Sequence, residues 1–93
     1  MPKFRKKPVV IEAVQYSMTQ PFEPGPAWLN EALAKRPGEV GAIWSDDEDA
    51  RVLMIGTLES PHECRVGDWI IQGVAGELYP CKPDVFAATY EPA

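Results

Sequence analysis

The sequence predicts an α+β domain, in which a single, mostly antiparallel β-sheet is covered by one helix. Short runs of β-branched and aromatic residues are separated by Pro and Gly turn signals, which is typical of strands. One stretch, at about 26–36, has apolar residues at helical spacing. The later strands follow one another with tight turns, which favours a meander, and a small, partly closed barrel is the alternative. With 93 residues, of which 45% are apolar, we expect one domain over 1–93.

The first strand is predicted over residues 9–16, after a basic lead-in that ends at Pro8. Apolar residues fall on both of its faces, so we expect this strand to be central in the sheet or covered on both sides. Residues 17–25 contain two prolines and a glycine and read as a loop.

The helix is predicted to begin at Pro26, because the missing N–H of proline is tolerated in a first helical turn. Pro37 and Gly38 stop it. A helix of this length does not persist alone, so we expect it to dock on the sheet. Its predicted buried face contains Trp28, Leu29, Ala32 and Leu33.

The remaining strands are short and end in a small helix. They are predicted over residues 40–44, 51–58, 62–66, 69–74 and 77–81. Gly56 marks a bulge or a close backbone approach, and Gly76 supplies positive φ in the last hairpin turn. Pro80 has no N–H for a ladder, so the last strand is an edge or ends there. The C-terminal helix is predicted at about 83–90, with Val85, Phe86, Thr89 and Tyr90 packing back on the sheet.

The charge pattern excludes some partners. The net charge is −5, and nucleic-acid binding requires a basic face, so we expect no nucleic acid as a partner. Basic residues near the start and the acidic run 46–49 read as a solvated arm and a solvated loop. No apolar run is long enough for a transmembrane helix or a signal peptide, so we expect a cytoplasmic location and no membrane contact.

Three side chains are candidates for a metal site or a catalytic site. His62 and Cys64 share a strand face, and Cys81 is a candidate third member of a zinc site or a nucleophile. No CxxC or HxxxH spacing supports either, and in the cytoplasm both cysteines are expected to be reduced. The glycines lack the phosphate-loop patterns. We therefore expect no catalytic residue, no metal and no cofactor.

A candidate binding corner lies where the last strand passes into the C-terminal helix. Pro80 stiffens the backbone there, Tyr79 is a typical interface anchor, and Lys82 and Asp84 offer opposite charges. Trp69 is added as a candidate contact residue. The alternative is that Tyr79 packs under the helix that carries Trp28, while the two charges only flank the start of the last helix.

Two parts of the chain resemble a family of small, mostly uncharacterised phage and prophage proteins. The first is FRKKPVVIEAVQY at residues 4–16. The second contains TLE at 57–59, GDWII at 67–71, GELYPCKPDVF at 76–86 and YEP at 90–92. The resemblance covers about half of the chain, and residues 17–50 have no counterpart in it. It implies a phage or prophage origin in a bacterial host, and it supplies no activity and no catalytic residue.

The leading hypothesis is therefore a phage accessory protein that acts as a non-catalytic binding module. Its partner would be a host protein or a small ligand. A self-associating structural or assembly protein is the alternative, for which a homodimer is expected. A small enzyme that uses Cys81 or His62 is the third hypothesis.

Overall fold

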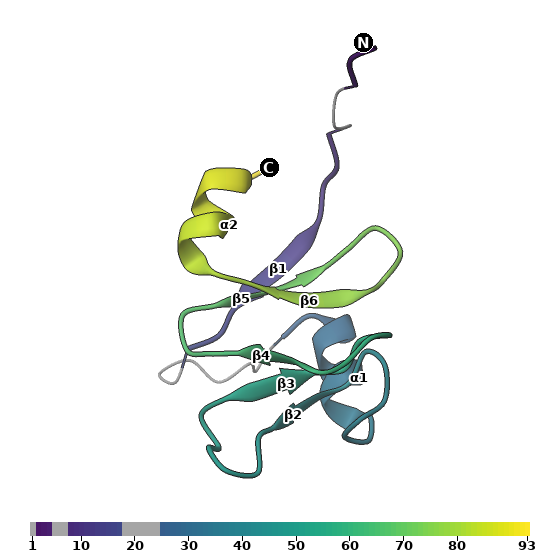
Figure 1. The fold of residues 1–93 in the computed structure, drawn as a ribbon, viewed down its shortest axis with the longest axis vertical. Coiled ribbons are helices and arrows are strands. Elements are labelled where there is room, and N and C mark those ends of the chain that lie inside the picture. Colours follow the sequence, from purple (N-terminus) through teal and green to yellow (C-terminus); the bar gives the residue numbers. More distant parts are fainter. Residues whose placement is uncertain (1, 5–7, 18–24) are drawn as a thin grey trace.

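The computed structural model of the protein describes residues 2–4, 8–17 and 25–93, and within them the chain forms six strands and two helices (Figure 1). In chain order these are β1 (Glu12–Gln15), α1 (Ala27–Ala34), β2 (Ile43–Ser45), β3 (Leu53–Ile55), β4 (His62–Cys64), β5 (Trp69–Gln72), β6 (Leu78–Cys81) and α2 (Pro83–Thr89). The predicted α+β class is confirmed. Both helices lie within the ranges that the sequence predicted.

The strands form two three-stranded antiparallel sheets, with the orders β1-β5-β6 and β2-β3-β4. The prediction of a single sheet is therefore not confirmed, and the described strands form no closed barrel. The reason lies in β5, which pairs with the distant strand β1 and not with its chain neighbour β4. The expected meander is retained within β2-β3-β4 and in the β5–β6 hairpin. The two sheets meet where β6 lies beside β4 (Figure 1).

The main core lies between the two sheets and α1. Leu29 of α1 is fully buried, and Ala32 lies one turn further along the same face. The sheets contribute Ile43, Leu53, Ile55, Cys64, Ile70 and Leu78. The predicted docking of α1 on the sheet is thus confirmed. Leu33 is an exception to the predicted face, because 42% of its surface is exposed.

β1 is an edge strand among the described strands, because its only strand neighbour is β5. Of the two predicted placements, central in the sheet or covered on both sides, the first is therefore wrong. It is also shorter than predicted, since β5 ends at Gln72, opposite Glu12, and turns away. Val9 and Val10 precede the paired region and are 48% and 80% exposed.

Two glycine predictions are confirmed. Gly56 donates its N–H to the carbonyl of Ala42 at 2.9 Å, and a Cβ there would collide with the backbone carbonyl of Glu39. This is the close backbone approach that the sequence indicated. Gly76 has φ +84° in the turn between β5 and β6, a conformation that residues with a Cβ rarely adopt.

Candidate functional site

An aromatic cluster of four residues, Trp69, Tyr79, Phe86 and Tyr90, joins α2 to the β1-β5-β6 sheet. The rings of Trp69 and Phe86 are stacked, with centroids 4.0 Å apart and an interplanar angle of 5°. The Tyr90 ring is tilted against Phe86 at 5.1 Å. Phe86 and Tyr90 are four residues apart, which places them on one side of the C-terminal helical segment. Val85 and Thr89 are exposed, so the prediction that they also pack on the sheet is wrong.

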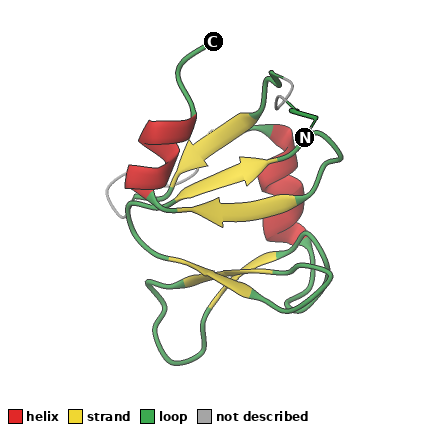
Figure 2. Ribbon diagram, turned by 45° about the horizontal axis from the view of Figure 1, so that its top comes forward, coloured by secondary structure: helices red, strands yellow, loops and turns green. Residues whose placement is uncertain are grey.

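The aromatic cluster covers the sheet face opposite to α1. Successive residues of a strand point to opposite faces, and paired residues share a face. Ile70 faces the main core with Leu29, so Trp69 and Ile71 face the other way, together with Tyr79, which pairs with Ile71. Figure 2 shows the two helices on different sides of this sheet. The cluster thus closes a second apolar layer, in which Ile71 is fully buried.

Tyr79 belongs to this second layer. Its hydroxyl lies 3.5 Å from that of Tyr90. Burial, followed by the hydrogen bond to Tyr90, raises the pKa of Tyr79 to about 12. The alternative that Tyr79 packs under α1 is therefore wrong, because the β5–β6 register turns it toward α2. Its ring is half-buried, so it contributes both to packing and to the surface.

A groove of about 490 Å³ opens beside the aromatic cluster. One wall is formed by residues 9–13, and the other by α2 with the C-terminal residues. Among the described residues that line it, Glu91 is the only charged one. The other lining residues are apolar or aromatic: Val9, Val10, Ile11, Ala13, Trp69, Phe86, Ala87, Tyr90, Pro92 and Ala93. A groove of this size and composition is typical of sites that take apolar groups.

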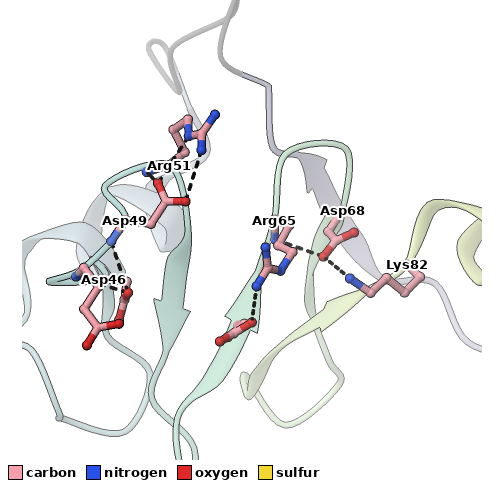
Figure 3. Close-up of polar contacts among 8 residues, drawn as sticks. Asp46, Asp49, Arg51, Arg65, Asp68 and Lys82 are labelled. Atoms are coloured by element: carbon pink, nitrogen blue, oxygen red, sulfur yellow. Dashed lines mark hydrogen bonds and ion pairs between the residues drawn. The ribbon is translucent and has the colours of Figure 1, made fainter.

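Lys82 is held by an ion pair within the chain. Its Nζ lies 3.0 Å from Oδ2 of Asp68, whose side chain is 5% exposed, while that of Lys82 is 61% exposed. The same Asp68 oxygen accepts the backbone N–H of Arg65 at 3.0 Å (Figure 3). Asp68 thus accepts a hydrogen bond from the backbone of its own turn. Lys82 therefore acts first as a link between β6 and the β4–β5 turn.

The other corner residues lie apart from the groove. Pro80 is half-buried on β6 opposite Ile70, on the face toward the main core. Asp84 is exposed in the first turn of α2. The acidic run forms a turn of its own, in which Asp46 accepts two backbone N–H groups and Asp49 binds Arg51 (Figure 3). Of the predicted corner, only Trp69 lines the groove.

The cysteines and the histidine do not form a reactive group. His62 is exposed, whereas Cys64 is fully buried. Burial raises the pKa of the Cys64 thiol to about 12 and also raises that of Cys81, so neither thiol is activated as a nucleophile. Both cysteines are free. Within the described residues, no three His, Cys, Asp or Glu side chains are arranged to hold a metal ion, and nothing in their arrangement indicates catalysis.

A second, wider hollow of about 820 Å³ lies between the β3–β4 and β5–β6 turns. Two of the charged side chains that line it, Lys35 and Glu77, already form hydrogen bonds within the chain. Lys35 donates to the carbonyl of Val40, and Glu77 accepts the N–H of Ala75. The groove beside α2 therefore has the clearer character of a binding site.

The wall formed by residues 9–11 is the part of the groove that the sequence did not predict. The spacing of Phe86 and Tyr90 was a usable signal for the α2 wall. Nothing local shows that residues 12–15 pair with 69–72, and this pairing brings the two walls together.

No protein-family model matches the chain, and comparison with curated proteins and with solved structures finds no match. None of the helices in the described part of the chain is long and apolar enough to cross a membrane.

Proposed function

We propose that the protein is a non-catalytic binding module that takes an apolar or aromatic group in the groove between residues 9–13 and α2. The observation that carries this proposal is the apolar lining of the 490 Å³ groove against the stacked Trp69–Phe86 pair. Binding of an apolar group to such a surface is favourable, because it removes apolar area from water. The apolar group belongs either to a small ligand or to a side chain of a host protein.

The test uses the uncharged dye N-phenyl-1-naphthylamine as an apolar probe. Ala87 lines the groove, whereas Ala88 is its exposed neighbour in α2 and does not. We expect Ala87→Lys to weaken dye binding about tenfold, equivalent to ~1.4 kcal/mol, and Ala88→Lys to leave it unchanged. Equal binding by both variants and the wild-type protein would show that the groove is not the site.

A lysate experiment separates the two sources of the apolar group. The wild-type protein and both lysine variants serve as baits, and proteins and small molecules are identified by mass spectrometry. A partner retained by the wild-type protein and by Ala88→Lys, but lost by Ala87→Lys, identifies the occupant. Recovery of the same molecules by all three baits would contradict the proposal.

A role in self-association is the second candidate function. It is supported by the edge position of β1, since an edge strand with a free side is a template for pairing with another chain. Light scattering that shows a monomer at high micromolar concentration would rule it out.

We further propose a phage or prophage origin and a place in the cytoplasm of the bacterial host. The support is the resemblance of residues 4–16 and of the segments between 57 and 92 to the phage family. The genes that flank this gene test the proposal. A position within an integrated prophage would support it, and a position in a host operon without phage genes nearby would contradict it.

A further inference from the structure

Among the described residues, β1 has no strand neighbour on the side away from β5, and the sheet identifies which of its backbone groups point to that free side. Tyr16 donates its N–H to the carbonyl of Asp68 and accepts the N–H of Gly67, both at 2.8 Å. Tyr16 therefore points its backbone groups toward β5. In an antiparallel pair these groups alternate in direction from one residue to the next. The N–H and C=O groups of Ala13 and Gln15 consequently point away from β5, toward the free side.

The residues on this edge are apolar and partly exposed. Val9 is 48% and Val10 is 80% exposed. Ile11 and Ala13, with Val9, line the groove beside α2. Among residues 8–14 the only charged side chain is that of Glu12. An occupant of this edge must supply an extended backbone and apolar side chains, and it must not place a carboxylate against Glu12.

We propose that two copies of the protein pair through this edge, with the segment 8–14 of each running antiparallel to that of the other and Ile11 opposite Ile11. The chain's own edge meets each of the three requirements. In this register Val9 faces Ala13 of the other copy, and Val10 faces Glu12, so the two carboxylates do not meet. The alternative centred on Glu12 would place like charges directly opposite each other and is disfavoured.

The pairing has a consequence for the groove. The contact is isologous, because the same surface of both copies is used. Val9, Ile11 and Ala13 line the groove, so the grooves of the two copies adjoin across the two-fold axis. The β1-β5-β6 sheets of the two copies join at their β1 edges into one six-stranded sheet. The α2 helices of both copies then lie on the same face of this sheet. The dimer forms without any ligand, so it does not depend on the proposed binding function.

Three charge variants of the full chain test the surface and the register together by sedimentation or light scattering. The wild-type protein is expected to be a dimer. Val10→Glu places a second carboxylate opposite Glu12 and is expected to give monomers at the same concentration. Val10→Lys places an ammonium group there and is expected to retain the dimer. Leu58→Glu, at a residue that is 91% exposed in the β3–β4 turn, is the matched control and is expected to remain a dimer.

A monomeric wild-type protein would overturn the proposal, as would a dimer that is insensitive to Val10→Glu. Cross-linking gives a second, positional test in a Cys81→Ser background. Directly opposite, hydrogen-bonded residues have Cα atoms about 5.5 Å apart, which suits a disulfide. Ile11→Cys is therefore expected to give a covalent dimer on mild oxidation, and Leu58→Cys is not. Equal cross-linking of both variants would contradict the pairing. This test remains decisive even if Val10→Glu fails to fold.

Discussion

Asp68 shows how much one buried side chain can fix. Its carboxylate accepts the Arg65 N–H and binds Lys82, so it connects the β4–β5 turn to the end of β6. We expect Asp68→Ala to lower the free energy of unfolding by about 1–3 kcal/mol, because the Arg65 N–H loses its acceptor. Asp47→Ala, at an exposed residue of the β2–β3 turn, should change it by less than about 0.5 kcal/mol. Urea titration of both variants measures the difference, and equal stabilities would contradict this role.

Tyr79 gives the protein a specific response to alkaline pH. Its pKa is raised from 10.0 to about 12 by burial and by Tyr90. The folded state favours the neutral phenol, so this contribution to stability is full below pH 10 and is lost as the pH rises from 10 to about 12. Tyr79→Phe removes the titrating group. We expect the variant to be less stable than the wild-type protein at pH 8 and the gap to narrow toward pH 12.

The measurement is the free energy of unfolding in urea as a function of pH. Burial also raises the pKa of Tyr16, and it raises those of both cysteine thiols, so the variant retains part of the alkaline loss. The prediction concerns only the difference between the two proteins. A constant difference from pH 8 to 12 would show that Tyr79 does not titrate differently in the folded state.

At the scale of elements, the buried face of α1 is narrower than the spacing of its apolar residues predicts. Leu29 is fully buried in the main core, whereas Leu33 is 42% exposed at the end of the same helix. We expect Leu29→Ala to cost about 2–5 kcal/mol, in the range of buried leucines. Leu33→Ala should cost under about 1 kcal/mol. Urea titration of this matched pair tests the orientation of α1, and similar costs would mean that the helix is rotated from the described position.

Trp28 illustrates the limit of the periodic pattern. Helical spacing places it beside Leu29, and the sequence predicted that it belongs to the buried face of α1. The structure places it at the margin of the core, with a buried indole N–H that has no partner within the described residues. The pattern identifies the side of a helix that faces the core. The extent to which each residue is covered depends on the sheets beneath, which are distant in sequence.

The existence and type of elements were predictable because each has a local cause. Pro83 is the first residue of α2, Pro26 directly precedes α1 as its N-cap residue, and glycine with positive φ forms the β5–β6 turn. The strand partners were not predictable in the same way. The pairing of residues 12–15 with 69–72 closes a loop of more than fifty residues, and no local signal specifies it. For the same reason Trp69 and Tyr79 were identified as surface contacts, while the wall of Val9 and Ile11 was missed.

At the scale of the whole molecule, the two sheets share one core. Ile70 and Leu78 of the β1-β5-β6 sheet pack in the same cluster as Ile43 and Ile55 of the other sheet, and Leu29 of α1 joins them. Neither sheet retains a complete apolar layer without the other, because the buried residues of both sheets pack in one cluster. We therefore expect the chain to unfold in one cooperative transition.

Trp44 on β2 and Trp69 on β5 report on the two sheets separately. Trp28→Phe with Trp44→Phe leaves only Trp69, and Trp28→Phe with Trp69→Phe leaves only Trp44. In each double variant, the fluorescence of the remaining tryptophan in urea should follow the same curve as the circular dichroism of the whole chain. The midpoints of the two variants can differ, since the substitutions differ, but within one variant the two signals should coincide. In the variant that retains Trp69, a fluorescence transition that precedes the circular dichroism transition would show that the α2 layer unfolds independently. The shared core would then not be what couples the two sheets.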